Sequence, residues 1–140
     1  MLHLVKLAVG VRDIAHLRAI QAERAVANPP LRHRTRHSPR RAAELLEGGS
    51  IYWGIGGMLA ARQALRDIIE DQWEDGSACA GLLLDPVVVP LRARPIKPFQ
   101  GWRYLAAAEA PEDLAADLPA RGADALPPAL RRELAALCLL

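Results

Sequence analysis

Short breaks rich in glycine and proline divide this chain into segments, and they limit its fold more than any other feature. Each break lies where an apolar run stops, so a helix or strand has to end there. Next to two of these breaks, apolar residues occupy every second position, which is typical of strands joined by turns. The breaks are Asn28-Pro29-Pro30, Gly48-Gly49, Gly56-Gly57, Asp75-Gly76 and Asp85-Pro86.

The first two segments predict a strand followed by a helix. Residues 3–11 alternate around His3, Val5, Leu7, Val9 and Val11, which indicates a strand. Asp13 is a good N-cap for a helix that we expect to reach about Ala27. The inner face of this helix would carry Ile14, Leu17 and Ile20.

A strongly basic stretch follows, with five arginines and two histidines in the ten residues after Leu31. We interpret residues 32–37 as a loop with solvated histidines. Ser38 and Pro39 form an N-cap and first-turn pair, so a helix is predicted to run to about Glu47. The basic loop would then lead into a helix N-terminus, where the backbone dipole also favours an anion.

The middle of the chain predicts several strands and one ambiguous segment. Residues 50–55 and 79–84 are apolar runs of strand length. Residues 58–69 favour a helix by propensity, but their twofold alternation favours a strand that returns from a Gly-Gly turn. An extended piece begins at residues 87–89, and the prolines after it favour an irregular or edge path.

Residues 98–105 gather three of the six aromatic side chains around a glycine and an arginine. In a strand, Trp102 and Tyr104 would share one face while Arg103 points to the other. The simpler interpretation is that the aromatic rings are core and that Arg103 pairs with a carboxylate. The alternative is a binding site, because an arginine beside aromatic rings can stack and still donate hydrogen bonds.

The last part of the chain is rich in alanine and leucine. Pro111 and the acids after it predict a short helix, and a leucine-faced helix is expected near the end. We therefore expect one α+β domain over residues 1–114 and a helical tail over residues 115–140 that packs on it. The alternative is that the tail helix pairs with a second copy of the chain or with another protein.

Length, charge and cysteine content exclude several classes of protein. A chain of 140 residues is long enough for one domain. Its net charge is only +2, although sixteen of the eighteen cationic side chains are arginine. Two cysteines cannot form a disulfide framework. We see neither a signal peptide nor a membrane-spanning run, so we expect a cytoplasmic protein without membrane contact.

Several short motifs, taken together and in order, resemble the uncharacterised bacterial family called domain of unknown function 1489. The resemblance covers roughly residues 2–114 and implies no activity. It favours a strand at residues 58–69, against helix propensity. Gly56 stands where the family pattern has a lysine. The motifs are Leu4-Val5-Lys6-Leu7, Thr35-Arg36 before Pro39-Arg40-Arg41, Gly48 to Trp53, Arg62-Gln63, Leu84-Asp85-Pro86 and Pro98 to Leu105.

The order of these segments suits a mixed α+β fold with a mainly antiparallel, partly barrel-like sheet, two or three packed helices and a helical C-terminal tail. This order is similar in outline to PUA-like and ASCH-like RNA-associated domains, which is an analogy of fold only.

We expect a basic, aromatic-walled cleft where residues 32–37 meet residues 98–104. Its first interpretation is a module that binds RNA or a nucleotide, because cations neutralise phosphates and aromatic rings stack on bases. The alternatives are an enzyme or sensor for a small phosphate- or carboxylate-bearing metabolite, and an interaction module that dimerises through the C-terminal helix. We assign no catalytic residue, metal ligand or cofactor. The expected anion-binding residues are Arg34, Arg36, Arg40, Arg62 and Arg103, and the expected stacking or wall residues are Tyr52, Trp53, Gln100, Trp102 and Tyr104.

Overall fold

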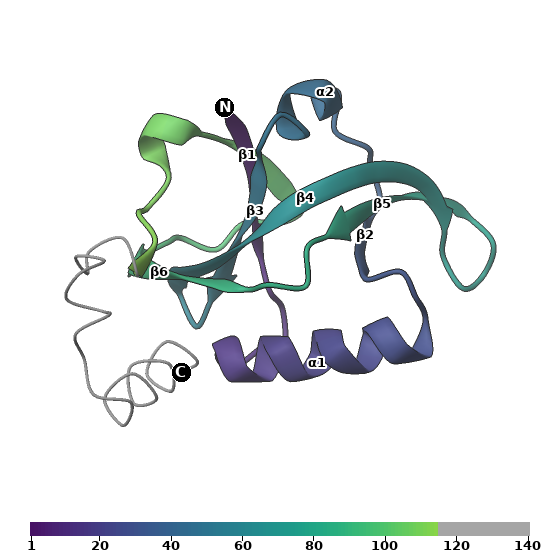
Figure 1. Cartoon of the computed structure of the whole chain (residues 1–140), viewed down its shortest axis with the longest axis horizontal. Helices are drawn as coiled ribbons and strands as arrows, with labels where there is room; N and C mark the ends of the chain where they lie inside the picture. Colours follow the sequence, from purple (N-terminus) through teal and green to yellow (C-terminus); the bar gives the residue numbers. More distant parts are fainter. Residues whose placement is uncertain (115–140) are drawn as a thin grey trace.

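The centre of the structure is an open, mixed sheet of seven strands (Figure 1), seen in a computed structural model that describes residues 1–114. The order is β2-β5-β4-β3-β1-β7, and β6 pairs with β4 outside this path. β1 and β3 are parallel, while the other pairs are antiparallel. The strands are β1 (Leu2–Leu7), β2 (Arg32–Thr35), β3 (Ser50–Ile55), β4 (Met58–Gln72), β5 (Ala78–Leu84), β6 (Val89–Pro95) and β7 (Trp102–Ala106).

The mixed α+β class is therefore confirmed, but the sheet does not close. β2 and β7 lie at opposite ends of the strand order and do not pair with each other. The partly barrel-like outline is thus wrong for the described residues. The tail over residues 115–140 lies outside them.

The ambiguous segment is the longest strand, β4, and the interpretation as a helix is wrong. Its first half buries every second side chain, from Leu59 through Ala61 and Gln63 to Leu65. It returns from β3 through Gly56 and Gly57, whose φ angles of 59° and 79° are the left-handed values that glycine adopts readily. β5 and β6 run antiparallel to successive stretches of it, so pairing outweighs alanine's helix propensity.

The first helix, α1 (Ile14–Ala27), begins and ends where the sequence indicates. The Asp13 side chain accepts a hydrogen bond from the His16 backbone N–H at 2.7 Å, as an N-cap does. The buried face of α1 includes Leu17 and Gln21. In Figure 1 the helix lies across one side of the curved sheet.

The basic stretch is a strand rather than a loop. β2 pairs with β5 from Arg32 to Thr35, and Thr35 is buried. The second helix, α2 (Ala42–Leu45), has only four residues and no side-chain cap, so Ser38 and Pro39 do not open it. The predicted anion site at a helix N-terminus is therefore absent from this stretch.

The end of the described chain is also different from the predicted short helix. A single 3₁₀ turn, η1 (Ala107–Glu109), follows β7. Asp113 then forms an isolated bridge with Leu91, and the Arg92 N–H donates to the Glu112 carbonyl at 2.8 Å. Residues 112–113 are thus held against β6 by backbone pairing instead of turning into a helix.

Two apolar clusters lie among the sheet side chains. The first contains residues of α1 and α2 with one face of β1 and β3, including Leu17, Leu45 and Trp53. The second contains Tyr52 and Leu105, with Phe99 packed against it. Because adjacent strand residues point to opposite faces, Trp53 and Tyr52 belong to different clusters. None of the helices in residues 1–114 combines the length and hydropathy of a membrane span.

Candidate functional site

The aromatic pair of β7 and the arginine between them lie on different faces of the sheet. Trp102 and Tyr104 pack against the first cluster, with ring centroids 5.1 Å apart. The Arg103 guanidinium lies 4.6 Å from the ring centroid of Phe99, which belongs with the second cluster. The strand therefore separates Arg103 from the two rings that were expected to share its cleft.

Part of the expected convergence does form. The Trp102 indole Nε1 donates to the His37 carbonyl at 3.3 Å. The Tyr104 hydroxyl accepts from the Arg41 N–H at 3.1 Å, and the Arg41 guanidinium lies over the Tyr104 ring. The segment that follows β2 thus meets β7, but through backbone groups and Arg41 instead of Arg36.

Arg62 and Tyr52 lie on the second face in a separate polar cluster. Arg62 forms a bidentate ion pair with Asp113, at 2.6 and 2.7 Å, and also donates to the Ser50 hydroxyl at 3.1 Å. The His3 ring packs edge-on against Tyr52, with centroids 4.9 Å apart. Burial and the charge of Arg62 lower the pKa of His3. Arg62 therefore stabilises the end of the described chain.

The remaining expected residues do not gather at one place. Arg36 lines a small hollow with Ile68 and Cys79. Arg40 and Gln100 are exposed. The ten expected site residues are thus spread over both faces of the sheet, and only Arg34 and Trp53 border the two hollows described next.

A more enclosed hollow lies between α1 and the sheet, beside β2, and we call it the α1–β2 cavity. Its volume is about 260 Å³. β1, α1, β2 and β3 all contribute side chains, so the cavity depends on the complete topology. Its lining residues are Lys6, Leu7, Ala8, Val9, Val11, Leu17, Ile20, Gln21, Arg24, Leu31, Arg32, His33, Trp53 and Leu84.

The cavity is basic and contains no acidic lining residue among those described. Lys6 and Arg24 reach it from β1 and α1. Neither forms an ion pair within residues 1–114. Burial lowers the pKa of Lys6, because the ammonium group loses part of its hydration without gaining a nearby carboxylate.

His33 is a partly buried imidazole in the wall of this cavity, so its interpretation as a solvated histidine is wrong. Its ring packs edge-on against the Trp53 indole, with centroids 5.1 Å apart. Burial, followed by the charges of Lys6 and Arg24, lowers the pKa of His33 to about 4. Its Nε2 atom is buried without a hydrogen-bond partner in the described part of the chain.

A buried amide network holds α1 against the sheet beside the cavity. Gln63 is 0% exposed, and its amide exchanges two hydrogen bonds of 2.6 Å with the amide of Gln21 on α1. The Gln63 oxygen also accepts from the Trp53 indole at 2.9 Å, and its nitrogen donates to the Asp85 carbonyl at 3.0 Å. Gln21, which lines the cavity, is therefore held in place by satisfied hydrogen bonds.

A wider hollow, which we call the outer groove, adjoins the cavity at the end of α1. Its volume is about 760 Å³. It shares Arg24, Leu31, Arg32 and His33 with the cavity. Its other lining residues are Ala27, Asn28, Arg34, Trp73, Glu74 and Asp75.

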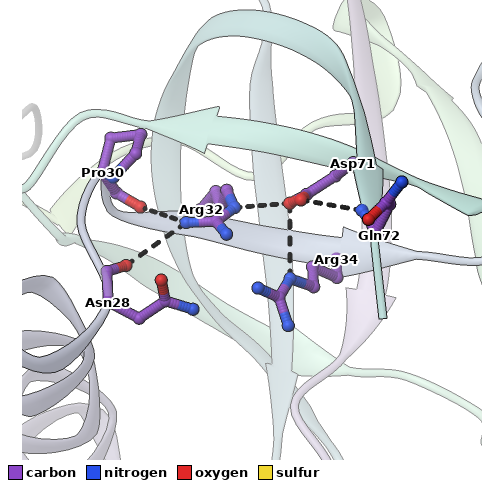
Figure 2. A network of polar contacts seen from close by, with 6 residues as sticks. All are labelled: Asn28, Pro30, Arg32, Arg34, Asp71 and Gln72. Atoms are coloured by element: carbon purple, nitrogen blue, oxygen red, sulfur yellow. Dashed lines mark hydrogen bonds and ion pairs between the residues drawn. The ribbon is translucent and has the colours of Figure 1, made fainter. Parts of the chain in front are cut away.

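Two arginines near the outer groove are already paired with one carboxylate (Figure 2). Arg32 and Arg34 both donate to Asp71, the latter at 3.3 Å. Arg32 also donates to the Asn28 and Pro30 carbonyls at the end of α1. Hydrogen bonds from Arg32 and from the Gln72 backbone lower the pKa of Asp71 to about 2. Lys6 and Arg24 are therefore the cavity cations without a carboxylate partner in residues 1–114.

Of the residues that line the cavity and the groove, the sequence predicts only Arg34 and Trp53 as site residues. Lys6, Arg24 and Trp73 are isolated in the sequence and come together only through the topology. One signal was present: Leu31, His33 and Thr35 alternate with three arginines, which is the parity of a half-buried strand. The many charged residues in this segment favour a loop and make its strand pattern hard to recognise.

A comparison with protein-family models matches residues 4–140 to a family described as Protein of unknown function (DUF1489). The chain belongs to this family. The DUF1489 match extends beyond the roughly 2–114 of the resemblance and includes every residue that lines the cavity and the groove. Searches of curated proteins and of solved structures returned no match. The description of DUF1489 gives no activity, so function has to be argued from the site.

Proposed function

We propose that this protein binds a small phosphate- or carboxylate-bearing ligand in the α1–β2 cavity. The observation that carries the proposal is Lys6, a partly buried ammonium group in a cavity whose described lining holds no carboxylate. A cation loses hydration energy when it is buried, and an anion within a few ångströms restores a favourable interaction. Anion binding would therefore relieve an unfavourable feature of the free protein.

The neighbouring side chains suit the same ligand. Arg24 supplies a planar fork of donors that can hold a phosphate or carboxylate by two hydrogen bonds. Burial and, to a smaller extent, the charges of Lys6 and Arg24 lower the pKa of His33 to about 4 and keep the imidazole neutral in the free protein. A bound anion would offset the charges of Lys6 and Arg24 and so raise the pKa of His33.

The size and position of the cavity favour a small ligand over an extended RNA strand. A volume of about 260 Å³ lies just below the usual range for ligand sites. The arginines expected to track an RNA backbone lie on both faces of the sheet, and Arg62 is held by Asp113. A small anion could bind with Lys6 and Arg24 alone.

The test is a titration of the ¹⁵N-labelled protein with inorganic phosphate, and separately with acetate, in a low-salt buffer free of other multivalent anions. The backbone amides of Lys6, Arg24 and His33 should shift in a saturable way. Lys6→Gln should weaken the affinity at least several-fold, because a charge in direct contact is removed. Lys97→Gln is the matched control, since Lys97 is exposed and outside the cavity.

Two results would overturn the proposal. One is the absence of saturable shifts with either anion. The other is an equal effect of Lys6→Gln and Lys97→Gln on affinity, which would indicate general attraction to a slightly basic protein. Circular dichroism of both variants keeps the comparison valid by showing that each is folded.

A further inference from the structure

The cavity and the outer groove share a wall but differ in chemistry. The described lining of the cavity has cations and no acid, whereas the groove adds the carboxylates Glu74 and Asp75. It also adds Trp73 at the turn between β4 and β5, which is 39% exposed. Within residues 1–114 no aromatic ring packs against this indole.

From this asymmetry we infer that the ligand is a nucleoside monophosphate unit, with its phosphate in the α1–β2 cavity and its ribose and base in the outer groove. The base stacks on Trp73. The inference rests on the proposed anion site and extends it from an anion to a class of ligand.

The charges fix the direction in which such a ligand lies. Glu74 and Asp75 would repel a phosphate but accept hydrogen bonds from ribose hydroxyls or base amino groups. The groove also borders Ala27 and Asn28 at the carboxyl end of α1, where the helix dipole is negative and favours donors. Lys6 lies only in the cavity, so the phosphate belongs there.

Trp73 provides a feature that a phosphate alone would not need. An exposed indole offers a flat surface on which any base can stack, and such contacts contribute substantially to nucleotide affinity. Arg34 lines the same groove, and its guanidinium is held in place by Asp71. The groove volume of about 760 Å³ has room for a ribose and a base.

The same chemistry occurs in a free nucleotide and at a 5′-phosphorylated RNA end. Calorimetry should compare inorganic phosphate, ribose 5-phosphate, adenosine monophosphate and a short RNA with or without a 5′-phosphate. We expect affinity to increase from phosphate to ribose 5-phosphate to the nucleotide. The RNA should bind only when it carries the 5′-phosphate, and its affinity relative to the free nucleotide distinguishes the two sources.

Variants of Trp73 test the stacking. Trp73→Ala should weaken binding of adenosine monophosphate about tenfold or more and leave phosphate binding unchanged. Trp73→Phe should restore most of the affinity, because it keeps an aromatic face. Since Trp73 lies in a turn and outside both apolar clusters, both variants should fold.

The outcomes separate this inference from the proposed function. If phosphate binds at the cavity but the nucleotide binds no more tightly, or if Trp73→Ala has no effect on the nucleotide, the inference is wrong and the anion site stands. Equal binding of RNA with and without a 5′-phosphate also contradicts it. If phosphate causes no saturable shift at Lys6, the proposed anion site is itself wrong, and this inference fails with it.

Discussion

The imidazole of His33 packs edge-on against the indole of Trp53, with 5.1 Å between the ring centroids. Twenty residues separate them in sequence, and β2 and β3 are not neighbours in the sheet. Both rings line the cavity between α1 and the sheet. Because His33 packs in this way, its protonation should change the free energy of unfolding.

Stability should fall in acid partly because of His33. Its pKa is about 4 in the folded protein, against an ordinary value of 6.5, so the unfolded chain binds more protons between these values. The contribution is fully present above pH 6.5 and is lost as the pH falls to about 4. It amounts to about 3 kcal/mol in the free energy of unfolding.

Urea unfolding in phosphate-free buffer at several pH values measures this contribution. His33→Gln should flatten the pH dependence by that amount, whatever its effect at neutral pH. His37→Gln is the control, since His37 is exposed at the end of the same segment. Parallel pH curves for the native chain and His33→Gln would contradict the prediction.

Gln63→Leu should be strongly destabilising. The variant removes the partners of the Trp53 indole N–H and of both polar atoms of the Gln21 amide in a fully buried setting. Groups left unsatisfied in this way cost about 1–3 kcal/mol each, so we expect a loss of about 3 kcal/mol or more. Gln72→Leu is the matched control on the exposed end of β4, and urea unfolding at neutral pH should show a loss only for Gln63→Leu.

Asp71→Asn should tighten phosphate binding several-fold and also lower stability. Asp71 neutralises Arg32, which lines both hollows, so its removal makes the site more positive. Its pKa of about 2 keeps the carboxylate ionised at every usable pH, so the effect should not depend on pH near neutrality. Calorimetry with phosphate checks this against Asp67→Asn, an exposed acid on the same strand. A weaker affinity in Asp71→Asn would place the anion elsewhere.

Asp113→Ala should loosen the end of the described chain from β6. The ion pair with Arg62 holds Asp113 in place, next to the Glu112 carbonyl that accepts from the Arg92 N–H. Hydrogen exchange of the Arg92 amide should become about fivefold faster, which corresponds to about 1 kcal/mol. Glu112→Ala keeps the backbone bond and should exchange at the native rate.

The same contact has a defined pH dependence. The ion pair with Arg62 lowers the pKa of Asp113, so its stabilising effect is present at neutral pH and is lost as the pH falls through the folded-state pKa. The exchange rates of the native chain and Asp113→Ala should therefore converge in acid. A constant ratio at all pH values would contradict an electrostatic role for Asp113.

Local signals in the sequence were enough to predict much of the fold. Asp13 precedes the apolar residues of α1 in the sequence and is its N-cap in the structure. Gly56-Gly57 forms the turn that joins β3 to β4. The failures came where long-range pairing overrides local chemistry. β2 is a strand because it pairs with β5. Ser38 resembles an N-cap in the sequence, but the next helix, α2, begins only at Ala42.

The candidate site could not be predicted for a related reason. The density of charge in the sequence points to the arginines, but Arg32 and Arg34 share the single carboxylate of Asp71, which lies 37 or more residues away in sequence. Among the residues that line the cavity, Lys6 and Arg24 form no ion pair within residues 1–114, and each stands alone among apolar or mixed neighbours in the sequence. Only the packing of α1 over β1 and β2 brings them together.

The reciprocal amides of Gln21 and Gln63 set the distance between α1 and the sheet. Sliding or lifting the helix would break both bonds at once in a buried setting, which opposes opening of the cavity by movement of α1. On the proposed function, a ligand would therefore meet a preformed shape, and the adjoining groove offers it a route of entry. Recognition here would follow a lock-and-key pattern, with selectivity set by dimensions that do not adjust to the guest.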